Sequence, residues 1–245
     1  TLMYLQTYNN QYPLLTDSAQ SPIDTKLICS WSYGGKTTAP FWKTQTAGAY
    51  SFRIQEKPIN QFIVPGPIEW DVEESDGSLR RTEVPTARCP SDRESEQRRK
   101  YTGDGAGISC YDDVGTTFQL NLHCIRGTDP LWYSETKGGG LWAPRLFNKM
   151  LRDAQDSFVD RFVILLEENM DYAVDSEQRM VGDHGKYSRF SMAFLDGHAT
   201  NQYADTRNWC DPGWMLINPR WVDPDNSRGL PIRYKDADKN CDPHN

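Results

Sequence analysis

The chain has 245 residues and a formal net charge of −7 at pH 7, a length that suits one elaborated domain or two small ones. Apolar residues make up 37 % of the chain, enough for a core under a polar, loop-rich surface. The negative charge argues against nucleic acid as a partner, because a protein that binds the phosphate backbone needs a basic face. The longest apolar run, 162–166, is strand-sized, well short of the ~20 residues that span a bilayer.

The six cysteines are scattered and form no Cys-x-x-Cys pair: Cys29, Cys89, Cys110, Cys124, Cys210 and Cys241. Metal knuckles and thioredoxin-type sites need close pairs, so an even set of separate cysteines favours disulfides in an oxidising compartment. Many pairings are compatible with the sequence. The one we expect joins Cys110 to Cys124, Cys210 to Cys241 and Cys29 to Cys89, and the alternative is a set of reduced, buried thiols.

Residues 1–10 place Leu2, Leu5 and Tyr8 at helical spacing, and Pro13 prevents the pattern from resuming. This predicts the last turns of a helix that begins upstream. An isolated helix of this length is marginal in water, so we expect it to dock on the domain or to continue upstream.

From 14 to about 90, short β-like pieces alternate with Gly and Pro; they are 26–31, 49–54 and 61–64. Asp76 and Gly77 suit a tight hairpin turn. The charge run 91–100 mixes both signs and predicts a solvated loop or helix face. The region 90–117 is polar and glycine-rich. Its 103–107 segment lacks the Lys-Ser/Thr of a phosphate loop and carries an acid where phosphate would lie, so we expect a flexible loop there.

Residues 142–157 predict an amphipathic helix with Leu146, Met150 and Leu151 inward and Pro144 in its first turn. A strand follows at 161–168.

The segments 189–195 and 198–203 flank Asp196 and Gly197, which predicts a hairpin with a type I′ turn and positive φ at both central residues. Beyond 205 the chain is irregular. The pattern as a whole predicts an α+β fold dominated by antiparallel strands.

Several short sequence segments follow one another along the chain in a recognisable order. Cys89, Pro90, Ser91 and Asp92 form a Cys-Pro-Ser-Asp segment, and strand-like stretches follow it at 115–121 and 162–168.

His184 then precedes the Asp196, Gly197, His198 turn. Together with the helix end at 1–10, this order resembles bacterial type IV pilin-like and type II secretion pseudopilin-like proteins, of the planctomycete type with a His-X9-Asp-Gly motif. Here eleven residues separate His184 from Asp196, so the chain resembles a divergent member.

The resemblance implies a single pilin-like head over 1–245, with 1–10 as the end of the N-terminal helix and 205–245 as an irregular C-terminal extension. The helix would pack on an antiparallel β-sheet with long disulfide-pinned loops. The implied function is a non-catalytic structural subunit of a secretion pseudopilus or pilus-like filament. Its partners would be other pilin-like subunits, with membrane contact only through a missing N-terminal helix. Its location would be the periplasmic face of the inner membrane or the extracellular space.

Catalytic roles are disfavoured on the sequence. We expect Asp196, His198 and His184 to serve in turns. Glu167 and Glu168 are adjacent, so on a strand they would point to opposite faces. A secreted hydrolase remains an alternative that rests only on scattered acids and histidines.

Asp236, Asp238, Asn240 and Asp242 alternate oxygen ligands like the start of a Ca²⁺ loop. Cys241 replaces the expected glycine and no Glu closes the loop, which excludes a complete EF-hand. Major pseudopilins are similar in carrying a C-terminal Ca²⁺ loop, so calcium is the one candidate cofactor, and a solvated acidic turn is the alternative.

Trp209, Trp214 and Trp221 provide the main rival function. Exposed tryptophans on a secreted β-rich domain stack on sugars, which would make the chain a carbohydrate-binding module with a polysaccharide as its partner. Buried tryptophans that anchor loops are the other use.

Overall fold

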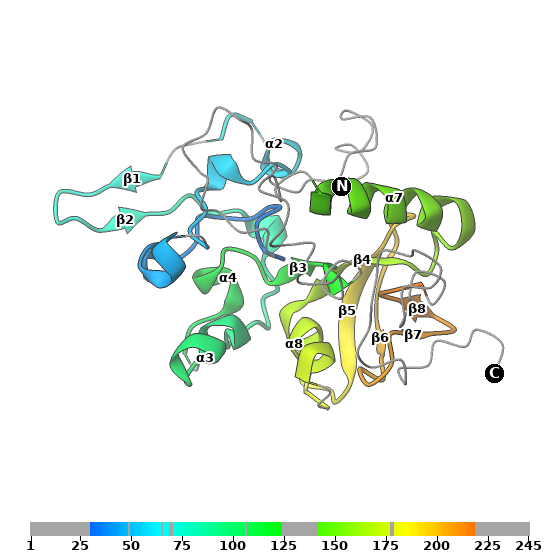
Figure 1. The fold of residues 1–245 in the computed structure, drawn as a ribbon. Helices are drawn as coiled ribbons and strands as arrows, with labels where there is room; N and C mark the ends of the chain where they lie inside the picture. Colours follow the sequence, from blue (N-terminus) through cyan, green and yellow to red (C-terminus); the bar gives the residue numbers. More distant parts are fainter. Residues whose placement is uncertain are drawn as a thin grey trace. The chain divides into compact units, whose positions relative to one another are not determined.

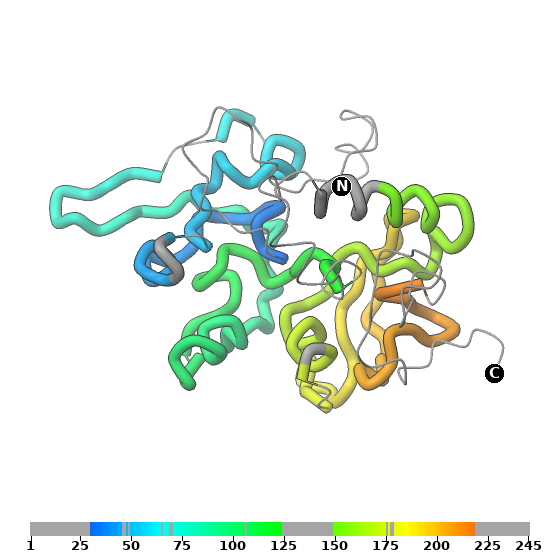
Figure 2. Tube along the Cα trace, in the orientation of Figure 1, coloured from blue at the N-terminus to red at the C-terminus, as the bar shows by residue number. Residues whose placement is uncertain are grey.

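The computed structural model describes residues 30–48, 50–64, 66–68, 71–105, 107–123, 142–176 and 179–218. The chain divides into two compact units, residues 1–120 and 121–245, and each is described by itself (Figures 1 and 2). The predicted helix end at 1–10 and most of the predicted extension at 205–245 lie outside the described residues. A single head over 1–245 stays a prediction. Within the described residues, no helix is long and apolar enough to cross a membrane.

The first unit consists of short helices and very short strands. They are η1 (Pro40–Lys43), η2 (Gln45–Gly48), η3 (Ile54–Glu56), α2 (Asn60–Ile63), β1 (Val72–Glu73), β2 (Leu79–Arg80), η4 (Pro85–Ala87), α3 (Glu96–Thr102), α4 (Cys110–Asp113) and β3 (Phe118–Leu120). Two buried clusters stabilise them. One contains Trp31, Trp42 and Phe52, and the other is built around Ile54 and Tyr111.

The β-like pieces predicted at 49–54 and 61–64 are wrong, because residues 50–53 form no strand, η3 begins at Ile54, and α2 covers 60–63. Asn60 explains part of this difference: its Nδ2 donates to the carbonyls of Gly35 and Ile54, both at 2.7 Å. The bond to Ile54 turns the 54–60 segment back on itself, and the bond to Gly35 ties it to the chain before η1. An apolar run this short does not distinguish strand from helix by periodicity alone.

Two short helices, α3 and α4, lie on either side of the predicted 103–107 loop. Each helix begins at a serine cap. Ser95 Oγ accepts a hydrogen bond from Arg98 N at 3.1 Å, and Ser109 Oγ accepts one from Asp112 N at 3.0 Å. Such caps satisfy backbone donors that a helix leaves open at its first turn.

The second unit contains the longer elements. They are α7 (Trp142–Ser157), β4 (Val163–Glu167), α8 (Glu168–Ser176), β5 (Arg189–Phe194), β6 (Ala199–Tyr203), β7 (Cys210–Asp211) and β8 (Trp214–Met215). β4, β5 and β6 are hydrogen-bonded in this order and run antiparallel (Figure 1).

The predictions for this unit are largely confirmed. The helix at 142–157 is α7, and both Met150 and Leu151 are buried as expected. The 161–168 strand is β4, and the 189–203 hairpin is β5 and β6. Helices together with antiparallel sheets make the described chain α+β, as predicted.

The type I′ geometry predicted for the β5–β6 turn is wrong. Gly197 has φ of 96°, but Ser188 is the only described non-glycine residue with a positive φ. Phe194 N donates to His198 O at 2.9 Å, and Gly197 N donates to Phe194 O at 3.0 Å. Asp196 contributes through its side chain, because its Oδ1 accepts from His198 N at 3.0 Å.

The predicted Asp76–Gly77 hairpin is confirmed between β1 and β2, and it uses the same three bonds. Glu74 N donates to Ser78 O at 2.8 Å and Gly77 N donates to Glu74 O at 2.9 Å. Asp76 Oδ1 accepts from Ser78 N at 2.8 Å. The Asp-Gly pair therefore specifies one turn geometry at two places in the chain.

The turn before β5 offers a matched pair of glycines. A Cβ at Gly182 would lie 2.0 Å from Arg189 O and 2.6 Å from Glu167 Oε1, whereas a Cβ at Gly185 would meet nothing within 4 Å. We expect Gly182→Ala to lower the free energy of unfolding by about 2–3 kcal/mol through overpacking. Gly185→Ala should lower the free energy of unfolding by only about 1 kcal/mol, because its sole cost is the φ of 73° at this position. Denaturant unfolding of both variants measures the difference, and equal losses would contradict this packing.

Candidate functional site

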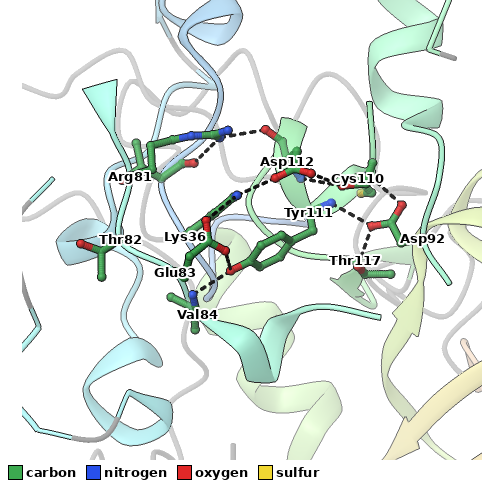
Figure 3. A network of polar contacts seen from close by, with 12 residues as sticks. Lys36, Arg81, Thr82, Glu83, Val84, Asp92, Cys110, Tyr111, Asp112 and Thr117 are labelled. Carbon is green, nitrogen blue, oxygen red and sulfur yellow. Dashed lines mark hydrogen bonds and ion pairs between the residues drawn. The ribbon is translucent and has the colours of Figure 1, made fainter. Parts of the chain in front are cut away.

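The Cys-Pro-Ser-Asp segment ends in a buried carboxylate that joins three distant parts of the first unit. Asp92 is 4 % exposed. Its Oδ1 accepts from Cys110 N at 2.9 Å, and its Oδ2 accepts from Tyr111 N at 2.9 Å and from Thr117 Oγ1 at 2.6 Å (Figure 3). We call this arrangement the Asp92 clamp. It fixes the start of α4 and the chain before β3 to the 89–92 segment.

Burial raises the pKa of Asp92 above its ordinary value, and the hydrogen bonds from Thr117 and from the backbone of α4 oppose that shift. The carboxylate is buried and accepts three hydrogen bonds from its own chain. Its geometry is that of a structural acceptor.

Cys89 and Cys110 flank the clamp as buried thiols, so the predicted Cys29–Cys89 and Cys110–Cys124 disulfides are wrong. Cys110 is 1 % exposed among apolar side chains, and its Sγ donates to Thr116 O at 3.1 Å. A reduced cysteine behaves as a small hydrophobe in such a place. Cys210 is disulfide-bonded, and its predicted partner, Cys241, lies outside the described residues.

A buried ammonium lies beside the clamp. Lys36 is 3 % exposed, and its Nζ donates to Asp112 Oδ1 at 2.6 Å and to Glu83 Oε1 at 3.1 Å (Figure 3). The same Nζ lies 4.3 Å from the centre of the Tyr111 ring. A buried cation needs such partners to offset its lost hydration.

The neighbours of Lys36 are tied into the same network. Burial alone would raise the pKa of Asp112, but hydrogen bonds from Lys36 and Ser109 outweigh it and lower that pKa. Tyr111 donates its hydroxyl proton to Glu83 at 2.8 Å and accepts from Val84 N at 2.7 Å. Burial raises the pKa of this phenol well above its usual range.

A fourth carboxylate, Asp113 at the end of α4, joins that helix to α3. Asp113 is fully buried and accepts from Trp42 Nε1 at 2.8 Å and from Ser95 Oγ at 2.7 Å, and it pairs with Arg98. The 91–100 charge run is therefore only partly solvated, because Asp92, Ser95 and Glu96 are buried. Each buried acid that the structure describes in this unit is hydrogen-bonded to the backbone or to a hydroxyl, or is paired with a cation.

In the second unit, the predicted motif residues occupy two turns. His184 lies exposed in the 182–185 turn. Asp196 and His198 belong to the β5–β6 turn, where Asp196 Oδ1 and His198 Nδ1 are 2.6 Å apart. The His198 ring stacks on the Phe194 ring at 4.2 Å. The backbone hydrogen bond from His198 lowers the pKa of Asp196.

Glu167 and Glu168 do not lie on one strand as expected, because Glu167 ends β4 and Glu168 begins α8. Glu167 is 1 % exposed and accepts from Asp183 N at 2.9 Å and from Ser191 N at 2.8 Å. Burial raises its pKa. This acid holds the 182–185 turn against β5.

One buried pair of ionisable side chains was not predicted from the sequence. His123 Nε2 lies 3.1 Å from Asp171 Oδ1, and both side chains are essentially inaccessible. Trp209 packs against the His123 ring with centroids 5.6 Å apart. No local spacing links these residues, so no motif would have found them. Their burial favours a structural ion pair or hydrogen bond.

The predicted platform of exposed tryptophans is wrong for two of its three residues. Trp209 is 8 % exposed and Trp214 is 1 % exposed, so neither offers a face to a sugar. Trp221 lies outside the described residues.

The calcium-loop residues also lie outside the described residues: Asp236, Asp238, Asn240 and Asp242. Within the part of the chain that the structure describes, no cluster of three or more His, Cys, Asp or Glu side chains is arranged to hold a metal ion.

Comparisons of the chain with protein-family models, with curated proteins and with solved structures found no match.

The Asp92 clamp makes a stability prediction. Asp92→Ala leaves two backbone N–H groups and a hydroxyl without their acceptor, and we expect a loss on the order of 3 kcal/mol in the free energy of unfolding. Asp92→Asn keeps one acceptor oxygen and should lose about half as much. The exposed Asp160→Ala is the control and should change stability by less than about 0.5 kcal/mol. Denaturant unfolding measures all three.

The pH dependence of the same variants has a defined sign. Because the folded-state pKa of Asp92 is raised, the folded chain binds this proton more tightly than the unfolded chain does. The contribution of this tighter proton binding to the free energy of unfolding is full below the unfolded-state pKa and is lost as pH rises through the folded-state pKa. Asp92→Asn should remove this loss of stability with rising pH. Identical pH profiles of stability for the variant and the wild type would contradict the raised pKa of Asp92.

Proposed function

We propose that the chain is the head of a pilin-like protein and serves as a non-catalytic structural subunit of a secretion pseudopilus or pilus-like filament. The proposal begins from the sequence resemblance. It is supported by what the motif residues do in the fold.

The Asp92 clamp is the observation that carries the proposal. A motif that does chemistry needs a reactive group that a substrate can reach, whereas Asp92 is buried and accepts hydrogen bonds from the backbone of α4 and from Thr117. Asp196 likewise stabilises a turn through His198 N. Residues of this kind maintain a loop-rich surface in one shape, which is what a subunit of an assembly needs.

Export to an oxidising compartment forms part of the proposal. The disulfide at Cys210 supports it, because such bonds persist mainly outside the cytosol. Cys89 and Cys110 are consistent with that location, since buried thiols are protected from oxidants. We place the head at the periplasmic face of the inner membrane or outside the cell, with other pilin-like subunits as partners.

The native gene product provides the test. We expect its mature form to carry, upstream of Thr1, a cleaved and N-methylated apolar helix of ~20 residues or more. Intact mass and N-terminal sequencing of the protein from its own cells would show it. A signal-peptide cleavage near Thr1 would instead define a freely secreted domain and would overturn the filament proposal.

Calcium binding at the 236–242 loop is proposed as an addition to the filament role. A ligand of the native state raises stability by about 2.7 kcal/mol at one hundred times its Kd. We therefore expect Ca²⁺ to raise the melting temperature and a chelator to reverse the rise. The double variant Asp236→Asn with Asp238→Asn should lose the shift while melting like the wild type in chelator. An unchanged wild-type melting temperature would refute the site.

A further inference from the structure

The β1–β2 hairpin projects from the first unit and carries an excess of acidic side chains. Figure 1 shows its two strands and their turn extending away from the helices of that unit. Its charged side chains between residues 72 and 80 are Glu73, Glu74, Asp76 and Arg80. Three acids and one arginine give this segment a net charge of −2 at neutral pH. Arg80 Nε lies 3.0 Å from Glu74 Oε1, so the excess negative charge lies at Glu73 and Asp76.

Hydrogen bonds at its base hold the hairpin on the first unit. Asp71 Oδ1 accepts from Thr82 N at 3.0 Å, and Arg81 Nη1 donates to the carbonyls of Thr37 at 3.0 Å and Asp112 at 2.8 Å. Beyond this base, every residue from 72 to 78 is exposed. A two-stranded hairpin is marginally stable in water by itself, so its strands would gain order from a surface that covers them.

A second exposed surface, in the second unit, combines aromatic rings with arginines. Val181 and Tyr187 face each other in an antiparallel bridge, and Arg189 pairs with Tyr203 across β5 and β6. Ala204 N donates to Ser188 O at 2.8 Å, so the two pairs lie side by side.

Two further arginines adjoin these pairs. Arg207 Nη2 lies 2.6 Å from Asp205 Oδ2. The hydrogen bond from Arg207 lowers the pKa of Asp205, and the positive charges of Arg207 and Arg179 lower it further. Arg179 therefore lies close to this acid as well.

We call this surface the basic patch, and it consists of Arg179, Val181, Tyr187, Arg189, Tyr203 and Arg207. Three arginines beside one acid, Asp205, give it a local net charge of +2. Asp183 and Lys186 in the adjoining turn cancel each other. The patch is therefore positive although the chain as a whole has a charge of −7.

Exposed apolar side chains gather on the same two surfaces. Within the described residues, the exposed large apolar side chains are Val72, Tyr101, Val181, Tyr187 and Tyr203. Val72 lies on the hairpin, and the three from the second unit belong to the basic patch. Tyr187 is the most exposed of them, at 73 %. Exposed apolar groups rimmed by charges are typical of surfaces that bind another protein.

We propose that the β1–β2 hairpin of one copy docks on the basic patch of a second copy. The contact would join subunits of the proposed filament, and its biological meaning rests on that function. Because the two surfaces differ, each copy would offer one hairpin and accept one. Such a head-to-tail contact can continue from copy to copy, as a filament requires.

Charge and apolar surface together favour the hairpin of a second copy as the occupant. The hairpin and the patch have opposite net charges of equal size, which steers the two together and disfavours hairpin–hairpin and patch–patch contacts. Val72 supplies an apolar group for the exposed rings of the patch. An acidic polysaccharide could match the charge of the patch, but it would leave the hairpin without a partner.

The contact is small. A hairpin of nine residues buries less than the ~1,200–2,000 Å² of a stable interface, so the isolated chain should associate weakly, with a Kd of about 10 μM or above. Exposed charges are screened by salt, so association of the wild type should weaken further when the salt concentration is raised.

Exchanging the charges of the two surfaces tests the proposal. The hairpin variant carries Glu73→Lys and Glu74→Lys, and the patch variant carries Arg179→Glu and Arg189→Glu. In each variant alone the two surfaces have the same sign, and association should weaken at least about tenfold. An equimolar mixture should associate about as tightly as the wild type, because each surface then meets one of opposite sign. Sedimentation equilibrium over a concentration series of the full chain measures all of these.

Two control variants carry the same changes in charge at exposed positions outside both surfaces. Asp156→Lys with Asp160→Lys matches the hairpin variant, and Lys43→Glu with Arg93→Glu matches the patch variant. At about 0.1 M salt, charges more than ~10 Å from the contact are largely screened. Both controls should therefore associate like the wild type, and a loss equal to that of the matched variant would overturn the proposal.

Tyr187→Ala tests the apolar part of the contact. It should weaken association and leave the melting temperature unchanged, because most of this ring is exposed. Association equal to that of the wild type would overturn the role of the ring.

Three results would overturn the proposal as a whole. They are a monomer at every concentration, a loss of association in only one of the two charge variants, and a mixture that fails to recover association. A monomer would include the case of a hairpin that docks on the patch of its own copy. None of these results bears on the N-terminal helix of the native product, so the filament proposal is tested separately.

Discussion

Buried carboxylates that must be hydrogen-bonded impose the constraint on which this structure depends. Removing an ionised carboxylate from water is costly unless donors replace the lost hydration. Asp92 meets that requirement with two backbone amides of α4 and a threonine hydroxyl, and Glu167 meets it with two backbone amides in the second unit. In each case the donors come from another segment, so satisfying the acid also fixes a loop. This is how strands of two or three residues and helices of four can hold one conformation in the first unit.

The same constraint bears on function. An acid that is surrounded by its own backbone donors has little capacity to bind or activate a substrate. Lys36 is in a similar position, since two carboxylates and the Tyr111 ring surround it. The charged groups of the first unit thus contribute shape more than reactivity. A protein whose polar interior maintains a surface suits a role in assembly, and this reasoning connects the Asp92 clamp with the proposed filament subunit.

The hairpins illustrate how a local signal and a tertiary feature combine. The two Asp-Gly turns contain the same pattern of three hydrogen bonds, although the β1–β2 and β5–β6 hairpins belong to different units. The turn sets the register of β5 with β6. That register in turn decides that Ala199, Asn201 and Tyr203 present their backbone groups away from β5.

The sequence by itself determined the elements that depend on local periodicity and turn chemistry. The helix at 142–157, the strand at 161–168 and both Asp-Gly hairpins follow from patterns within a few residues, because amphipathic spacing and the side chain of Asp act locally. The α+β class follows from the same patterns.

Only the tertiary structure decided the rest. The donors of Asp92 lie 18, 19 and 25 residues away, and the His123–Asp171 pair joins segments that no motif connects. The thiol state of Cys89 and Cys110, the burial of Trp209 and Trp214, and the helical state of 60–63 likewise depend on which distant segments pack around them. Those neighbours are brought together by long-range packing and hydrogen bonds, which a linear pattern does not encode.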